Sequence, residues 1–558
     1  MSDVPAPTRK RATKRPRKRP VKATEGSASS ETPADNNNNN VPKPVELLPH
    51  QTTHYERLLS LFQTCPHSIL LDTSETGAGK TYTAGKIAQE LKLPHLVIIC
   101  PASAVATWKP FLREYGFPTA TTRLLTYGEL RSAKSPFVYR EKRINANRER
   151  GMRFTSYTTR EYVQLVQEGL FLIIDEVHNA KNWSLQAQSI LALTSQIRDH
   201  QIHNNRSRAL LLSATPFDKP EHLFHLSRLL GIVRSEKLYF MNVQTRSLVT
   251  DGYQDMIELA RRLHPQKTTD HMFAYCALSA RNIRKAFSVA CRGIIFPAIS
   301  SSMSKPRIEQ KIITQNGFFE VPESQIANMA QALHKLRQVA QERSLAMTDA
   351  THAGRLLALQ SEAIKLLEYA KREIFLKLAL EKLTTQPTAK VLIFVSYHTT
   401  LQWLADALAD YKPILFSGTT SKDDREKALV KIQAPDTRYR LFLGITQVSG
   451  ESISLHDLHG DFPRYLFISP SFNLTHVYQS IGRINRVGVK SDSAATVVFL
   501  KGSERDGFAL TAELKTRLLL NDKAKFLRTV LHEEVRNKAL LPDEFPVYVE
   551  GAAGPTSS

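Results

Sequence analysis

The chain contains little cysteine. Four cysteines occur in 558 residues, and they are too few and too scattered for a disulfide framework or for a zinc site built on Cys-x-x-Cys pairs. They stand at Cys65, Cys100, Cys276 and Cys291. Two of them fall in apolar stretches, as expected of core residues in a reducing compartment. The cysteines therefore point away from a secreted, disulfide-stabilised protein.

Long apolar runs are also missing. No stretch reaches the roughly 18 residues that a membrane-spanning helix needs, and no apolar segment like that of a signal peptide stands near the start. We therefore expect a soluble, intracellular protein. Acidic residues are in deficit, because 53 Asp and Glu stand against 75 Lys and Arg, which gives a net charge of +22. A surplus of this size favours a polyanionic partner, nucleic acid before membrane, since no amphipathic basic helix or lipidation motif is evident.

Residues 1–44 have almost no large apolar side chain and are rich in Pro, Ser, Thr, Asn and basic residues. Such a segment cannot bury a core, and we expect it to be a disordered basic tail. Its basic clusters leave three interpretations open: a tail that only adds solubility, a nuclear-import signal, and a nonspecific nucleic-acid arm. The import signal is the basis for expecting a nuclear location.

Two regions, 45–230 and 386–502, alternate short apolar runs with helical patterns. Runs such as 170–174 consist of Leu, Ile and Phe alone, which is typical of parallel strands buried on both faces. The predicted fold class is therefore α/β, with two lobes that are each built on a parallel sheet covered by helices.

The segment between these regions, 231–385, has a different pattern. Apolar residues in its second half recur at helical spacing, which predicts a mainly helical insertion. Residues 503–558 are expected to form a C-terminal helical extension and a tail. Within the first lobe, residues 131–162 are basic and carry interleaved aromatic side chains. They are interpreted as a loop on nucleic acid or, equally, as a solvated insertion.

A phosphate-loop pattern, Ser74-Glu75-Thr76-Gly77-Ala78-Gly79-Lys80-Thr81, lies between a predicted strand and a predicted helix. Backbone N–H groups of such a loop and the helix N-terminus cradle a triphosphate. Glycines let the backbone approach phosphate, the lysine reaches the β and γ phosphates, and the threonine hydroxyl binds the metal. The predicted nucleotide-binding residues are Thr76, Gly77, Ala78, Gly79, Lys80 and Thr81. Ser74 departs from the pattern, which has glycine at its first position.

Two carboxylates, Asp175 and Glu176, directly follow the apolar run 170–174. The end of a central parallel strand lies beside a phosphate loop. Asp175 is therefore predicted to hold Mg²⁺ together with Thr81, and Glu176 to position the attacking water. The plain alternative is an acidic start to the helix near Ser184.

In their order along the chain and in their residues, these motifs resemble those of helicase superfamily two, and specifically of its Swi/Snf-like branch of duplex-DNA translocases. The resemblance covers about residues 46–500 and includes the box Asp175-Glu176-Val177-His178-Asn179-Ala180-Lys181-Asn182. Departures occur at Ser449 and Ser452, where the family usually has glycine, and at Asn485 and Val489. This combination of Swi/Snf-like motifs with departures from them is similar to that of Swi/Snf-like ATPases encoded by large DNA viruses.

The resemblance implies two tandem RecA-like lobes with ATP and Mg²⁺ bound between them. It assigns adenine reading to Gln51 and contacts with the γ-phosphate to Arg483 and Arg486, which join Lys80, Asp175 and Glu176 as catalytic residues. It assigns coupling between nucleotide and nucleic acid to His178, Ser213, Ala214, Thr215, Gly450, Gln479 and Gly482.

The expected function is an ATP-dependent translocase or helicase that moves on duplex DNA and binds it without strong sequence preference. Protein partners are conceivable but not identified by any motif. One alternative is a transcription-associated nucleic-acid-dependent ATPase or an RNA helicase. A non-enzymatic alternative is a nucleic-acid-binding scaffold with a decayed ATPase, which the substitutions at Ser449 and Ser452 favour and the intact Lys80 and Glu176 oppose.

Removal of residues 1–44 should weaken nonspecific nucleic-acid binding and leave basal ATP hydrolysis intact. If three of the clustered basic residues contact phosphates, the slope of log affinity against log salt concentration falls by about 2.7. The measurement is binding at a series of salt concentrations, with nuclear accumulation in a eukaryotic cell as a second readout. An unchanged slope and unchanged localisation would favour the solubility tail.

Overall fold

The structure is a computed structural model that describes residues 43–143, 153–200, 206–242, 244, 247–265, 280–306, 308–342, 350–449, 453–501, 509–531 and 544–548. The basic tail and most of the C-terminal tail lie outside these ranges. Both expected sheets are present, and every pairing within them is parallel. Among the helices of these ranges, none is long and apolar enough to cross a membrane.

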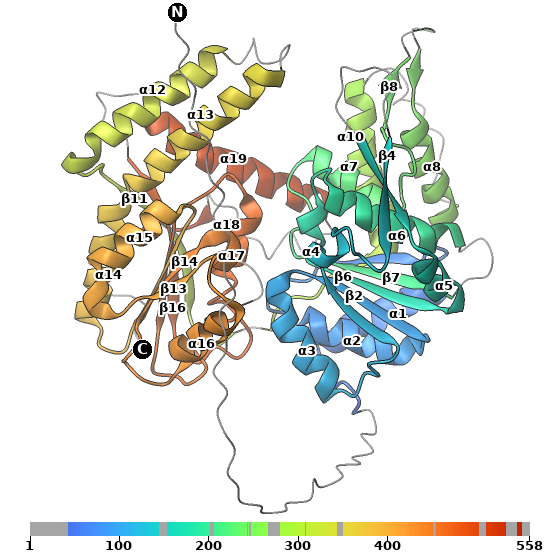
Figure 1. Ribbon diagram of the computed structural model, residues 1–558, viewed down its shortest axis with the longest axis horizontal. Coiled ribbons are helices and arrows are strands. Elements are labelled where there is room, and N and C mark those ends of the chain that lie inside the picture. The colour runs from blue at the N-terminus through green and yellow to red at the C-terminus, as the bar shows by residue number, and fades with distance from the viewer. Residues whose placement is uncertain are drawn as a thin grey trace, which may run out of the picture. The chain divides into compact units, whose positions relative to one another are not determined.

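The first sheet has six strands in the order β10-β1-β7-β6-β2-β3, of which β7, β6 and β2 are labelled in Figure 1. Their bounds are β1 Ile69–Asp72, β2 His95–Cys100, β3 Thr122–Thr126, β6 Leu170–Asp175, β7 Arg208–Leu212 and β10 Ser300–Ser301. The central strands are buried along almost their whole length. Helices α1 Pro49–Thr64, α2 Lys80–Leu91, α3 Val105–Glu114, α4 Tyr127–Leu130, α5 Arg160–Glu168, α6 Leu185–His200 and α7 Pro220–Leu229 complete this part of the chain.

The second sheet also has six strands, in the order β11-β16-β15-β12-β14-β13. They are β11 Ile312–Phe319, β12 Lys390–Val395, β13 Ile414–Phe416, β14 Leu441–Ile445, β15 Arg464–Ile468 and β16 Ser493–Leu500. Helices α14 Arg372–Thr385, α15 His398–Ala407, α16 Lys422–Gln433, α17 Thr446–Ser449 and α18 Leu474–Ile481 belong to the same region. The α/β fold class with two parallel-sheet lobes is therefore confirmed.

The segment 231–385, predicted to be a mainly helical insertion, also carries strands that join the two sheets. It contains α8 Asp251–Leu263, α10 Ala280–Ala290, α11 Phe296–Ile299, α12 Ile326–Glu342 and α13 Ala350–Tyr369, but also β10 and β11. Because β10 pairs with β1 and β11 pairs with β16, the segment contributes a strand to each lobe. The sequence pattern hid both strands, since β10 is only two residues long and β11 carries Thr314, Gln315 and Asn316 in place of an apolar run.

The basic stretch 131–162 forms a hairpin of β4 Val138–Arg143 and β5 Arg153–Thr158 in its described part. Tyr139 stacks on Tyr157 with ring centroids 5.6 Å apart. Arg140 donates to the carbonyl of Arg131 and, at 2.9 Å, to the Ser189 hydroxyl of α6. This arginine is thus bonded to the first lobe, and contact of the hairpin with nucleic acid stays a prediction. A second hairpin pairs β8 Phe240–Met241 with β9 Leu248–Val249.

Helix α19, Ala509–Val530, touches the cores of both lobes. Its Leu527 packs in the core of the first sheet, whereas Leu520 packs in a cluster of the second sheet. Leu520 is 1% exposed and Leu527 is 2% exposed. The C-terminal helix therefore connects the two lobes through buried apolar side chains.

Truncation of either leucine should destabilise the protein, because each leaves a cavity in a different core. Leu527→Ala and Leu520→Ala are each expected to cost about 2–5 kcal/mol of unfolding free energy, the usual range for a buried leucine. Lys525→Ala, on the exposed side of the same helix, is the matched control. Thermal unfolding midpoints would test this, and a midpoint of Leu527→Ala equal to that of the control would show that α19 does not brace the first lobe.

Candidate active site

The phosphate loop leaves β1 at Asp72 and enters α2 at Lys80. Gly77 and Gly79 have φ values of +84° and +97°, a region that residues with a Cβ rarely adopt. Lys80 Nζ donates to the carbonyls of Ser74 at 3.0 Å and Glu75 at 3.1 Å. The loop therefore has the tight backbone that its sequence predicted, and the contact of Lys80 with the β and γ phosphates stays a prediction.

A cavity of about 680 Å³ lies over this loop. Predicted residues from both lobes line it, namely Gln51, Thr76, Gly77, Ala78, Gly79, Lys80, Thr81, Asp175, Glu176 and Arg486. Ser454 and His456 of the second lobe and Tyr82 of α2 also contribute to its wall. The structure thus brings most of the predicted nucleotide site together around one space.

The two carboxylates stand at the end of β6 with different surroundings. Asp175 accepts a hydrogen bond from Trp108 Nε1 at 2.9 Å, and Tyr127 donates to its carbonyl at 2.8 Å. Burial, and then the charge of Glu176, raise the pKa of Asp175. Burial alone would also raise the pKa of Glu176, but the hydrogen bond and charge of His178 and the charge of Lys80 outweigh it and lower that pKa. Glu176 is therefore the carboxylate held in its charged form.

A metal ion fits the donor set at this position. Thr81 and Asp175 line the same cavity, and they carry a hydroxyl and a carboxylate, the kinds of oxygen ligand that hard cations such as Mg²⁺ prefer. The buried Asp175 carboxylate has an elevated pKa, and a nearby cation would offset the cost of its charge. Glu176 also has a left-handed backbone with φ of +54°, which is uncommon for a residue with a side chain and occurs at functional sites.

The predicted coupling residues form a chain of contacts from the acidic pair to the second lobe. His178 Nδ1 lies 3.2 Å from a carboxylate oxygen of Glu176 and 3.1 Å from the Ser213 hydroxyl. Its Nε2 lies 3.2 Å from the amide nitrogen of Gln479 in α18. Thr215 N donates to the Ser213 hydroxyl at 3.2 Å, and Ala214 stands between the two. Gly450 lies outside the described residues, so its predicted role has no structural counterpart here.

The two predicted arginines lie in different places. Arg486 lines the cavity and packs on Gly77, where a Cβ would lie 2.9 Å from Arg486 Cγ. Arg483 is 1% exposed, does not line the cavity, and donates to the carbonyls of Gln479 at 3.0 Å and Ile453 at 2.9 Å. In this conformation only Arg486 is placed to reach a bound phosphate. A direct contact of Arg483 with the γ-phosphate stays a prediction and requires its side chain to move.

Gln51 contacts the phosphate loop. Its Oε1 accepts from Leu48 N at 2.9 Å, and its Nε2 donates to the Ala78 carbonyl at 3.0 Å. A primary amide has two N–H groups, so one N–H of Gln51 has no bond assigned by these two contacts. The predicted reading of adenine therefore stays a prediction, while the observed contacts hold α1 against the loop.

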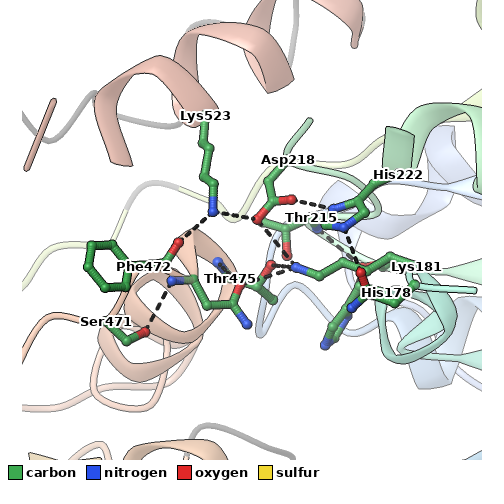
Figure 2. Close-up of polar contacts among 12 residues, drawn as sticks. His178, Lys181, Thr215, Asp218, His222, Ser471, Phe472, Thr475 and Lys523 are labelled. Atoms are coloured by element: carbon green, nitrogen blue, oxygen red, sulfur yellow. Dashed lines mark hydrogen bonds and ion pairs between the residues drawn. The ribbon is translucent and has the colours of Figure 1, made fainter. Parts of the chain in front are cut away.

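A buried polar cluster around Asp218 crosses from the first lobe to the second (Figure 2). Lys181 Nζ lies 3.3 Å from Asp218 Oδ2, and it donates to Asn473 Oδ1 at 3.1 Å and to Thr475 Oγ1 at 3.3 Å. Lys523 of α19 donates to the carbonyl of Phe472 and lies 3.6 Å from Asp218. Lys181 and Lys523 therefore connect the first lobe, the start of α18 and the C-terminal helix.

Charge compensation explains why Asp218 is tolerated there. Burial alone would raise the pKa of Asp218, but the hydrogen bond with His222 and the charges of Lys181 and Lys523 outweigh it and hold that pKa well below its usual value. The sequence motifs assign no role to Lys181, although it lies in the acidic box from Asp175 to Asn182. No local pattern marks Lys523, which stands in α19, far along the chain.

Two family models match the chain. That of the helicase conserved C-terminal domain matches residues 370–488, and that of the type III restriction enzyme res subunit matches residues 44–218. The first range holds Gln479, Gly482, Arg483 and Arg486, and the second holds the phosphate loop and the acidic pair. The chain belongs to helicase superfamily two. It is a nucleic-acid-dependent ATPase of the helicase type, as the motifs predicted.

Two individual proteins are similar to this helicase. A protein of Acanthamoeba polyphaga mimivirus, named putative ATP-dependent RNA helicase, is 23% identical over 474 residues, which are 82% of this chain and 80% of that protein. The solved Sulfolobus solfataricus SWI2/SNF2 ATPase core in complex with dsDNA covers 90% of this chain and 98% of its own, with 14% identity and a TM-score of 0.31.

Gly482→Ala should impair this helicase by separating its two lobes at the site. A Cβ there would lie 2.9 Å from Thr76 Cγ2 and 3.1 Å from Thr76 Cβ, so Thr76 of the phosphate loop or the arginine segment must shift. Misplacement of this kind costs on the order of 10²-fold in rate. The measurement is ATP turnover with saturating nucleic acid. Gly354→Ala, where nothing lies within 4 Å of the added Cβ, is the control, and equal turnover of the two variants would contradict the close approach.

Proposed function

We propose that this helicase is an ATP- and Mg²⁺-dependent translocase on duplex DNA. The observation that carries the ATP site is the shared cavity, which is lined by Lys80, Thr81, Asp175 and Glu176 of the first lobe and by Arg486 of the second lobe. The net charge of +22 supports nucleic acid as the partner, and the acidic box from Asp175 to Asn182 favours duplex DNA.

Each side chain has a distinct task in this proposal. Lys80 exchanges its bonds to the loop carbonyls for the β and γ phosphates. Glu176, held in its charged form by His178, accepts a hydrogen bond from the attacking water and orients it. Thr81 and Asp175 would hold Mg²⁺, which neutralises phosphate charge when bound. Arg486 stabilises the charge that spreads over the γ-phosphate in the transition state.

Coupling to nucleic acid follows from the same contacts. A triphosphate attracts Arg486 more strongly than a diphosphate does, so it favours the closed arrangement of the two lobes. Glu176 contacts His178, and His178 contacts both Ser213 of the first lobe and Gln479 of the second. A change of charge at the acidic pair therefore reaches both lobes through a single imidazole.

An RNA helicase, or a transcription-associated ATPase, is the second candidate. It is supported by the name of the mimivirus relative, which is a putative ATP-dependent RNA helicase. Backbone phosphates are common to DNA and RNA, so the surplus of basic residues does not discriminate between them. Stimulation by different nucleic acids does discriminate.

Turnover is expected to be stimulated most by duplex DNA and to vanish in Lys80→Ala, because the phosphates lose their cationic anchor. Glu176→Gln should still bind ATP and DNA without turnover, since the amide cannot accept the water's proton. Steady-state hydrolysis with no nucleic acid, duplex DNA, single strands and RNA tests the partner, and nucleotide binding by both variants tests the division of labour.

Greater stimulation by RNA than by duplex DNA would replace the duplex-DNA assignment with the RNA-helicase candidate. Turnover in Lys80→Ala equal to that of the unmodified protein would refute the site itself. Lys311→Met is a suitable control for the loss of one lysine charge, because this side chain is exposed and lies in the connection between the two sheets.

A further inference from the structure

Residues 302–311 connect β10 of the first sheet to β11 of the second, so they form a covalent link between the lobes. This linker begins alongside the phosphate loop. Thr73 N donates to the Ser301 carbonyl at 2.9 Å, Met303 N donates to the Ser74 hydroxyl at 2.9 Å, and Glu75 N donates to the Met303 carbonyl at 3.2 Å. The first linker residues are thereby held to the strand and loop that carry the nucleotide site.

Lys305 extends this connection to the second lobe. Its Nζ donates to the backbone carbonyl of Asn485 at 2.6 Å. Asn485 lies between Arg483 and Arg486, directly before the arginine that lines the cavity. One side chain of the linker thus binds the backbone of the arginine segment, while the linker backbone binds the phosphate loop.

The surroundings of Lys305 are mainly cationic. Three cations, Lys80, Arg483 and Arg486, act on its charge, and Glu75 supplies opposite charge. His456 of the second lobe also lies near Lys305, but burial and then the charge of Arg486 lower its pKa to about 4, so it is neutral near pH 7. Burial, and then these cations, lower the pKa of Lys305 to about 8. The phosphates of ATP would supply the negative charge that this cluster of cations lacks.

We propose that Lys305 is a positioning residue of the ATP site, whose ammonium group holds the Arg483–Arg486 segment against the phosphate loop. The proposal rests on the proposed function, in that ATP must occupy the cavity beside Lys80. Bound triphosphate compensates the repulsion between Lys305 and its cationic neighbours. The hydrogen bond from Lys305 to the Asn485 carbonyl is therefore stronger with nucleotide than without it. Lys305 acts through Arg486 and contacts no reacting atom.

The first test separates turnover number from affinity. Lys305→Met is expected to lower kcat by about 10- to 100-fold, as for the loss of one charge-assisted hydrogen bond, with little change in KM for ATP. Lys305→Arg should restore much of kcat, because a guanidinium also donates to a carbonyl and keeps its charge. Lys311→Met removes the same charge from an exposed position of the linker and should turn over like the unmodified protein.

The second test uses pH. Because kcat/KM reports the free enzyme, it should fall as pH rises through about 8, where Lys305 loses its proton in the absence of nucleotide. Binding of phosphate raises the pKa of the ammonium group, so kcat itself should decline only at a higher pH. In Lys305→Arg the alkaline decline of kcat/KM is expected to disappear, since a guanidinium stays protonated. A role in folding alone would not shift these profiles.

Unchanged kcat in a folded Lys305→Met, or a change confined to KM, would overturn the positioning role. Should Lys305→Met fail to fold, the pH profile of Lys305→Arg decides, and a profile identical to that of the unmodified protein would also overturn it. Absence of ATP turnover in the unmodified protein with every nucleic acid is a different result, because it contradicts the proposed function before Lys305 is considered.

Discussion

The whole site depends on the close packing of the phosphate loop against the arginine segment, which belong to different lobes. At Gly482 an added Cβ would lie 2.9 Å from Thr76, and at Gly77 it would lie 2.9 Å from Arg486. At these points the glycine backbone of one segment lies directly against a side chain of the other, which leaves no room for a Cβ unless something shifts. Because packed backbones move as bodies, a ligand that attracts Arg486 must draw its lobe with it. The proposed coupling of nucleotide charge to lobe movement depends on this constraint.

Buried charged residues are the second feature that holds the site together. Asp72, at the end of β1, accepts from Ser74 N at 2.8 Å and pairs with His54 at 3.1 Å, which fixes the entry to the phosphate loop. Asp218 is compensated by Lys181 of its own lobe and by Lys523 of α19. An isolated buried carboxylate is costly. The two lobes and the C-terminal helix are therefore held by contacts that lose their benefit when a partner moves away.

Local patterns in the sequence predicted local structure well. The apolar runs at β1 and β6 are continuous because both faces of each strand are buried, and the phosphate loop follows β1 with a spacing that a short turn fixes. The sequence did not reveal structure or roles that depend on contacts between residues far apart in the chain. The two residues of β10 carry no pattern of their own, and neither Lys305 nor Lys523 lies in a motif. Their roles arise from chain segments that only the fold brings together.

Ser74 shows how a departure from a motif gains a physical explanation. It occupies a position where the phosphate-loop pattern has glycine, and the sequence alone offered no reason for a side chain there. In the structure its hydroxyl accepts a hydrogen bond from Met303 N and lies 3.3 Å from His54 Nε2. Glycine could make neither contact. Ser74 is therefore the residue at which the linker that carries Lys305 is attached to the nucleotide site. The same hydrogen bond with Met303 explains both the departure from glycine and the connection between the lobes.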